Sequence, residues 1–280
     1  MPALITAFNN ALLNTNHVTE SNVDREGSSL SDKKICVKGI PAFAQKSHHM
    51  EKEKSKEYIQ LFDCETEALL ASFDAEYLNV LRIALCAALA SDLLAPASID
   101  RLAVVGTGKR VEAYLKTFSA LRQVRNILVF DHNPFASGRF CAEMSRQMDA
   151  KFVAAGNLTE VLFEADVAVL NVETREPFLF QEMLDATYLC SLLENQLGQE
   201  FSEALWLTSE VICSESTRQQ NVLSSGKKID FIHTDLTSRL LDKNPNKSAN
   251  SIKVYLTMRA ERQDLLVAWQ LYQQYLAKKN

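Results

Sequence analysis

The chain has 280 residues, of which 47% are hydrophobic and 23% charged, a composition typical of soluble globular proteins. The formal net charge of -5 at pH 7 gives no reason to expect a nucleic acid or an anionic membrane surface as a partner. The segment Met1–Asn10 lacks a basic region followed by an apolar stretch, so we expect no signal peptide and a cytoplasmic location.

The first 60 residues are predicted to be largely irregular, with a short strand at Ile35–Val37 and a solvated loop from Gln45 to Lys56. A strand–turn–strand pattern follows at Tyr58–Phe62 and Ala68–Phe73. The strongly apolar segment Tyr77–Leu94 contains two charged residues within 18 positions. We therefore predict a buried helix there rather than a membrane span.

The middle of the chain, from about Ile99 to about Lys227, alternates apolar strands with helical segments, which is typical of a parallel sheet covered by helices. The strands are near-continuous apolar runs, as expected where both faces of a sheet are buried. The predicted strands are Leu102–Val105, Asn126–Phe130, Lys151–Ala154, Val167–Leu170, Tyr188–Leu193 and Glu210–Cys213. The predicted helical segments are Arg110–Arg122, Pro134–Met148, Leu158–Glu164, Leu179–Leu184 and Thr217–Ser224. A polar linker at Lys243–Asn250, a strand at Ile252–Thr257 and a helix at Glu261–Leu276 complete the prediction.

The six cysteines are widely spaced, with no C-x-x-C pair and no histidine cluster nearby. This pattern argues against a metal site and against a disulfide scaffold, so free and mostly buried thiols are expected. The cysteines are Cys36, Cys64, Cys86, Cys141, Cys190 and Cys213.

A glycine turn joins the first strand of the alternating region to its helix, through Gly106, Thr107 and Gly108. In a dinucleotide site the first glycine makes a tight turn and the second lets the backbone approach the pyrophosphate. The helix N-terminus then attracts the anion. Lys109 and Arg110 would either contact phosphate or be exposed in the first helical turn. Val111 stands where a glycine or alanine would allow closer packing between the helix and the strand. A G-x-G alone is a weak signal for a dinucleotide site, but its place between a buried strand and a helix strengthens it.

Asp131 ends the next strand, 25 positions after Gly106. An acid there accepts hydrogen bonds from the ribose hydroxyls of NAD and repels the extra phosphate of NADP, so NAD is the expected cofactor. The alternative is that Asp131 is only a polar strand end or a helix cap. Asn171, which follows the strand Val167–Leu170, completes the expected cofactor-binding set.

Several segments together resemble the ornithine cyclodeaminase and mu-crystallin family. Their order and spacing carry the resemblance more than any one motif. The segments are Val37–Gly39, Leu61–Ala71, Leu81–Ala90, Gly106–Val111, Glu164–Leu170, Ser251–Leu256 and Gln263–Tyr272.

The resemblance implies a Rossmann-type α/β domain, residues 98–244, inserted in a smaller α+β substrate and dimerisation domain. That smaller domain would consist of residues 1–97 and 245–280. It also implies a homodimer and redox chemistry at the carbon of a small amino or imino acid. Lys38 matches the family lysine near the reacting centre and the substrate carboxylate, and Arg82 matches the arginine that grips that carboxylate. If the resemblance is set aside, Lys38 could be a surface lysine, and Arg82 could belong to a structural ion pair.

The chain also departs from the family pattern. Ile83 and Leu85 replace a threonine and an alanine after the arginine, and the chain has only eight glycines. The family loop that carries a catalytic aspartate is reduced here to Leu193–Glu200, where Glu194 is a substitute for that acid and Glu200 matches the final acid of the motif. The sequence leaves open which of Glu194, Asn195 and Glu200 would face the nicotinamide. Two hypotheses remain: an NAD(P)-dependent oxidoreductase of a small amino or imino acid, and a non-catalytic relative that keeps the fold for ligand binding or association.

Overall fold

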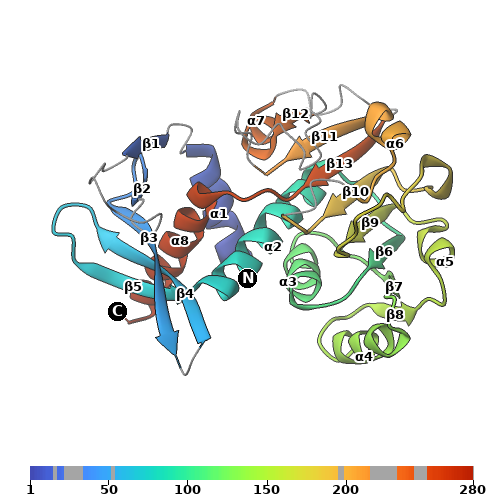
Figure 1. Cartoon of the computed structure of the whole chain (residues 1–280), viewed down its shortest axis with the longest axis horizontal. Helices are drawn as coiled ribbons and strands as arrows, with labels where there is room; N and C mark the ends of the chain where they lie inside the picture. The colour runs from blue at the N-terminus through green and yellow to red at the C-terminus, as the bar shows by residue number, and fades with distance from the viewer. Residues whose placement is uncertain are drawn as a thin grey trace. The chain divides into compact units, whose positions relative to one another are not determined.

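The computed structural model describes residues 1–14, 18–21, 34–51, 54–194, 199–214, 232–242 and 251–279. The chain forms two compact units (Figure 1). The first combines Met1–Arg82 with Ala260–Asn280, and the second is Ile83–Arg259. The predicted helix Thr217–Ser224 and the predicted linker Lys243–Asn250 lie outside the described residues.

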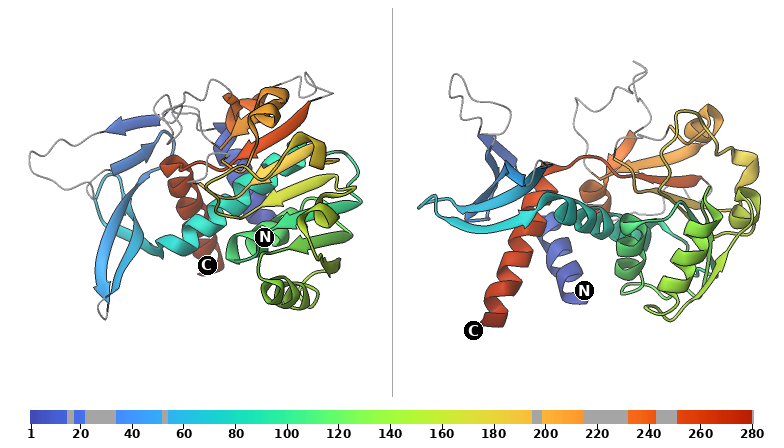
Figure 2. Two further views of the ribbon diagram at one scale, coloured as in Figure 1. Left: turned by 45° about the vertical axis from the view of Figure 1, so that its right-hand side comes forward. Right: turned by 60° about the horizontal axis from the view of Figure 1, so that its bottom comes forward.

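The first unit is a five-stranded antiparallel sheet packed against two helices. Figure 2 shows the helices α1 and α8 side by side. The sheet order is β1-β2-β3-β4-β5, and α8 contacts both α1 and the strands from β2 to β5. The elements are α1 (Pro2–Asn14), β1 (Val18–Ser21), β2 (Lys34–Val37), β3 (Ala42–Glu51), β4 (Lys54–Asp63), β5 (Leu69–Asp74) and α8 (Glu261–Lys279).

Within the described residues, the prediction of a largely irregular N-terminal region was wrong, although its short strand at Ile35–Val37 is confirmed as β2. α1 forms because Leu4, Ile5, Phe8 and Leu12 recur at helical spacing and are all buried. The segment predicted as a solvated loop instead supplies half of the paired residues of the β3–β4 hairpin, which pairs ten residues on each strand. The segment is polar, but it continues two strands whose other halves bury Phe43, Ile59 and Leu61 in the core, and the pairing satisfies its backbone hydrogen bonds.

The predicted buried helix is confirmed as α2 (Ala75–Leu94). Among the described residues it is the helix with the length and apolar composition to cross a membrane, but 72% of its most apolar window is buried within the protein. Asp74 accepts a hydrogen bond from the backbone N–H of Tyr77 at 3.0 Å, which satisfies one donor of the first turn. The observed burial matches the sequence-based interpretation of a core helix.

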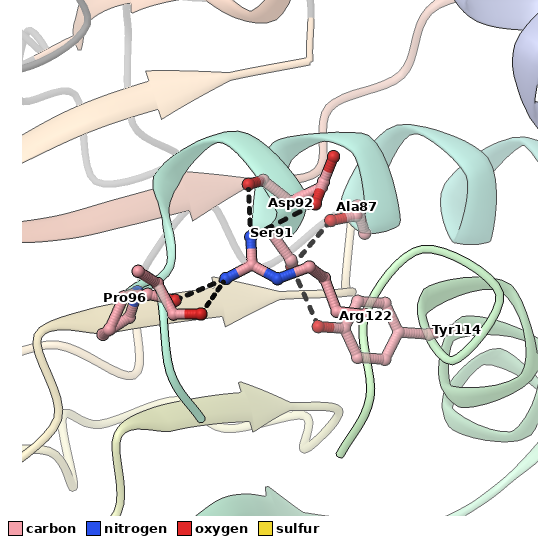
Figure 3. Close-up of polar contacts among 7 residues, drawn as sticks. Ala87, Ser91, Asp92, Pro96, Tyr114 and Arg122 are labelled. Carbon is pink, nitrogen blue, oxygen red and sulfur yellow. Dashed lines mark hydrogen bonds and ion pairs between the residues drawn. The ribbon is translucent and has the colours of Figure 1, made fainter. Parts of the chain in front are cut away.

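Arg122 caps the other end of α2 (Figure 3). Its Nη1 donates to the backbone carbonyl of Asp92 at 3.1 Å and to the carboxylate of the same residue at 3.2 Å. Its Nη2 donates to the carbonyls of Pro96 and Ala97, at 2.6 and 3.0 Å. A cation at this position satisfies orphan carbonyls and complements the negative end of the helix dipole. The contacts fix the segment that leads from α2 into the second unit's sheet.

The second unit is built on an eight-stranded parallel sheet in the order β12-β11-β13-β10-β9-β6-β7-β8. Every residue of β9 and of β10 is buried, as expected for strands covered on both faces. The strands are β6 (Arg101–Val105), β7 (Asn126–Phe130), β8 (Lys151–Ala154), β9 (Val167–Leu170), β10 (Tyr188–Ser191), β11 (Ser209–Cys213), β12 (Ile232–Asp235) and β13 (Ile252–Leu256). The helices are α3 (Lys109–Phe118), α4 (Pro134–Met144), α5 (Leu158–Leu162), the 3-10 turn η2 (Gln181–Met183), α6 (Glu203–Thr208) and α7 (Leu236–Leu241).

The observed boundaries of the two units differ from the expected ones at 97/98 and 244/245. The first unit ends within α2, at Arg82, and resumes at Ala260. β13 was expected to belong to the smaller domain, but it pairs with β10 on one side and with β11 on the other. Its hydrogen bonds therefore place it inside the large parallel sheet.

A buried polar cluster lies between α2, α3 and β10. Tyr114 donates from its hydroxyl to Ser91 Oγ at 2.8 Å, and Ser91 donates to the carbonyl of Ala87 at 2.7 Å (Figure 3). Tyr188 lies 3.2 Å from the same serine oxygen. Burial raises the pKa of the neighbouring Cys190 thiol to about 12, so this thiol stays protonated at neutral pH. All six cysteines are free, and four of them, including Cys190, are buried, as predicted.

Candidate functional site

The carboxyl ends of the parallel strands bring several predicted site residues to one edge of the sheet. Val105, the last residue of β6, is in register with Phe130 of β7 and with Leu170 of β9. The next residues along these strands are Gly106, Asp131 and Asn171. β6 has β7 and β8 on one side and β9 and β10 on the other, so the edge includes the point where the strand order reverses. Ligands of open α/β sheets bind at such a point.

Gly106 sits where a side chain has no room. Its φ is +86°, and a Cβ built on it would overlap the backbone carbonyl of Asn171 and lie 2.8 Å from Val172 Cγ2. Gly108 has a φ of +121° with a ψ of -177°, a conformation that is essentially restricted to glycine. Both glycines are therefore required by the turn itself, which leaves backbone uncovered at the N-terminus of α3.

Asp131 is tied to the glycine turn. Its Oδ2 accepts hydrogen bonds from the backbone N–H of Thr107 at 3.0 Å and from the Thr107 hydroxyl at 2.7 Å. Its Oδ1 accepts from the backbone N–H of Asn133 at 2.9 Å, and Asn133 is the N-cap of α4. The helix cap is thus Asn133 rather than Asp131. The link to Thr107 was not predicted, because it joins residues on two separate strand ends.

Asn171 holds the turn from the other side. Its Nδ2 donates to the carbonyl of Thr107 at 2.8 Å, and its backbone N–H donates to Val105 at 2.8 Å. Its side-chain Oδ1 is buried and has no hydrogen-bond partner among the described residues. The structure therefore joins Thr107, Asp131 and Asn171, all predicted to bind cofactor, in one hydrogen-bonded network.

The first turn of α3 carries Lys109 and Arg110, which are basic residues at the positive end of a helix dipole. Arg110 Nε is buried and has no hydrogen-bond partner in the described part of the chain. Lys116, further along the helix, is already paired with Glu112 at 2.6 Å. An anion at the helix N-terminus would complement the two basic residues and supply the missing acceptor.

Arg82 is the predicted substrate-binding residue of the first unit, and the structure buries it. Its side chain is 1% exposed, and its Nε donates to Asp264 Oδ1 at 2.7 Å. Its Nη2 donates to Asn79 Oδ1 at 2.6 Å. The arginine thus has an anionic partner within the chain. Asp264 was not predicted, although the need of a buried arginine for an acid could have directed attention to an aspartate within the apolar stripe of α8.

Lys38 lies in a different environment from Arg82. It is exposed on the tight turn between β2 and β3, next to Gly39, whose φ is +87°. The exposed side chain of Lys38 is therefore accessible to a ligand.

Two acids follow β10, the strand next to β9. Glu194 is partly buried and lies three residues after the end of the strand. Glu200 is only 2% exposed, and its Oε2 has no hydrogen-bond partner among the described residues. Burial raises the pKa of the Glu200 carboxyl. The sequence identified Glu200 as a match to a family acid and as one of the residues that could face the nicotinamide.

Residues 28–279 match the sequence pattern of the ornithine cyclodeaminase/mu-crystallin family. The chain belongs to this family. Ornithine cyclodeaminase-like solved structures share its fold at low identity. A probable ornithine cyclodeaminase from Bordetella pertussis Tohama I is 19% identical with a TM-score of 0.77, over 100% of this chain and 94% of that one. Thermococcus litoralis Delta(1)-pyrroline-2-carboxylate reductase, in complex with NADH and L-proline, is 17% identical with a TM-score of 0.74, over 99% of this chain and 93% of that one.

A curated member of known activity is more similar over a shorter stretch. The NAD(P)H-dependent anabolic L-arginine dehydrogenase DauB of Pseudomonas aeruginosa is 37% identical over 110 residues. These residues are 39% of this chain and 34% of that protein, so the match spans about a third of the dehydrogenase. The comparisons establish the family and confirm the predicted architecture of a Rossmann-type domain with a second, antiparallel sheet.

Proposed function

We propose that this family member is an oxidoreductase that binds NAD(H), in preference to NADP(H), and acts on a small amino or imino acid. The observation that carries the proposal is the glycine turn at the end of β6, joined by hydrogen bonds to the acid at the end of β7. The turn, the acid and the free helix N-terminus are the three parts of a dinucleotide site.

The described residues fit the cofactor. The backbone at Gly106 and Gly108 would approach the pyrophosphate, and the first turn of α3 would supply N–H donors together with Lys109 and Arg110. The buried Arg110 Nε, which has no partner among the described residues, would gain an acceptor. When bound, the nicotinamide would give or accept the hydride. The Thermococcus litoralis reductase has been solved in complex with NADH, and the Pseudomonas aeruginosa dehydrogenase is NAD(P)H-dependent.

Substrate binding is assigned to the first unit. Arg82 would bind the substrate carboxylate, because planar two-point pairing with carboxylates is what a guanidinium does well. Asp264, which accepts from its Nε, would fix the plane of the guanidinium. Lys38 would orient the reacting end of the substrate, and Glu194 would move the proton that accompanies hydride transfer at the amino or imino carbon.

A second candidate function is favoured by one observation. Arg82, which would bind the substrate carboxylate, is already buried in an ion pair with Asp264, and a purely structural ion pair would have the same geometry. In that case the chain is a non-catalytic member of the family that keeps the fold for ligand binding or association. Cofactor binding without turnover of any amino or imino acid would support this alternative.

The test is a titration of the purified protein with NADH and with NADPH. The readouts are quenching of Trp206 and Trp269 and energy transfer to the reduced nicotinamide. Saturable NADH binding that is tighter than NADPH binding is the expected result, and a screen of small amino and imino acids for turnover follows. Absence of binding of either cofactor at about 1 mM, the upper end of ordinary enzyme affinities, would refute the proposal.

The remaining expectations concern assembly and location. A homodimer is the expected assembly, and light scattering of the purified protein measures it directly. The six free thiols suit a reducing compartment, in line with the expected cytoplasmic location, which imaging of a tagged chain would test.

A further inference from the structure

The Thr107 hydroxyl uses one of the hydrogen-bond acceptor positions of Asp131, the acid that would select the cofactor. It donates to Asp131 Oδ2 at 2.7 Å, and the backbone N–H of the same residue donates to the same oxygen at 3.0 Å. The other oxygen, Oδ1, accepts from Asn133 at 2.9 Å. Among the described residues, three protein donors therefore converge on one carboxylate.

A carboxylate has about four acceptor positions, two on each oxygen. Both positions on Asp131 Oδ2 are taken by Thr107, and one of the two on Oδ1 is taken by Asn133. A ribose with free 2′- and 3′-hydroxyls offers two donors, but one acceptor position remains for them. Each donor also compensates part of the negative charge that would repel a 2′-phosphate.

We propose that Thr107 is a cofactor-specificity residue, whose hydroxyl limits the preference of Asp131 for NAD(H) over NADP(H). It acts through Asp131, by filling an acceptor position that the ribose would otherwise use and by screening the carboxylate from a 2′-phosphate. The inference rests on the proposed function, because it requires a dinucleotide at this edge of the sheet.

The hydroxyl can be removed without moving the turn. The Thr107 carbonyl is held by Asn171 Nδ2 at 2.8 Å, and the Thr107 N–H remains bonded to Asp131 whatever the side chain is. Valine has the shape of threonine without the donor, so Thr107→Val removes one hydrogen bond and leaves the backbone contacts in place. Thr107→Ser keeps the donor and is the matched control.

The experiment measures dissociation constants for NADH and NADPH at one fixed ionic strength, by the same fluorescence titration. One additional hydrogen bond to a charged group corresponds to about ten-fold in affinity. Thr107→Val is therefore expected to raise the NADH-over-NADPH preference about ten-fold, and Thr107→Ser to leave it near the wild-type value. Thr107→Ala, which also lacks the hydroxyl, serves if the valine variant does not fold.

Asp131→Ala supplies the second control. If Thr107 acts through the carboxylate, Thr107→Val changes the preference in the wild-type background and has no effect on it in the Asp131→Ala background. An unchanged or reduced preference in Thr107→Val would overturn the inference while leaving cofactor binding intact. Wild-type protein that binds neither cofactor would instead overturn the proposed function, and with it this inference.

Discussion

Asp264 and Arg82 form a buried pair whose disruption has a calculable cost. Their side chains are 8% and 1% exposed, so removal of the acid leaves a guanidinium charge that water does not reach. Breaking a buried pair by removing one partner costs about 3–5 kcal/mol. With a urea m-value of about 2 kcal/mol/M, Asp264→Ala is expected to lower the unfolding midpoint of the first unit by about 1.5–2.5 M.

The assay reports on the first unit alone if Trp206 is replaced by phenylalanine, because Trp269 then remains as the single tryptophan and lies in α8. The matched control is the exposed pair between Lys34 and Glu67, at the same 2.7 Å separation but with side chains 29% and 68% exposed. Glu67→Gln is expected to cost less than about 1 kcal/mol, since exposed pairs contribute little.

A double-mutant cycle completes the argument. If the penalty of Asp264→Ala is the unpaired charge, then adding Arg82→Met should recover most of the lost stability, because apolar replacements of buried pairs are often neutral. A loss below about 1 kcal/mol in Asp264→Ala would refute the reasoning. It would mean that the other hydrogen bonds of Arg82, such as the one to Asn79, satisfy it without the acid.

Three further predictions follow from single positions. Gly106→Ala should destabilise the second unit by more than about 2 kcal/mol, because it adds a Cβ at positive φ against a backbone carbonyl. Gly138→Ala, in open space within α4, should instead stabilise the unit by about 0.5–1 kcal/mol. Urea denaturation of both variants checks the contrast, and equal effects would contradict it. The raised pKa of Glu200 means that the folded state holds a proton that the unfolded state releases above the ordinary value of 4.5. The free energy of unfolding should therefore fall as pH rises above that value. Glu200→Gln should remove the part of this fall that Glu200 causes, which urea midpoints at pH 5 and pH 8 would show. An identical pH dependence in the variant would count against a buried neutral acid. Cys64, which is exposed, should react with a thiol reagent in the native protein, whereas the buried Cys190 should react only after unfolding; mass spectrometry of timed samples decides, and early modification of Cys190 would contradict its burial.

The parallel sheet was predictable because its central strands are short, continuous apolar runs separated by helical patterns. The outer half of the β3–β4 hairpin, from Gln45 to Lys56, was not, because its residues are polar and carry no apolar alternation, and they form strands by pairing with each other. α6 and α7, of six residues each, are too short for a helical period to show. The position of β13 between β10 and β11 depends on which distant strands pair, which local periodicity does not encode.

The same distinction applies to the candidate site. Gly106, Gly108 and Asp131 were identified from the sequence because a strand, a turn and a helix place them locally. The contacts that define their environment are long-range: Thr107 meets Asp131 across 24 residues, and Arg82 meets Asp264 across 182. Pairing of this kind depends on the assembled fold, so the sequence indicated the need of Arg82 for an anion without identifying which acid supplies it.

The order of strands in the large sheet has a consequence for biosynthesis. Among the described strands of this sheet, β13 is the last to leave the ribosome, yet it pairs with β10 and β11, which are made about forty or more residues earlier. Until it emerges, β10 and β11 each present an unpaired edge, and such edges template aggregation. The helix α8, which covers the antiparallel sheet, emerges later still. A nascent or prematurely terminated chain that ends before residue 252 thus leaves both cores incomplete, and we expect it to be a substrate for chaperones and proteases rather than a partly functional protein.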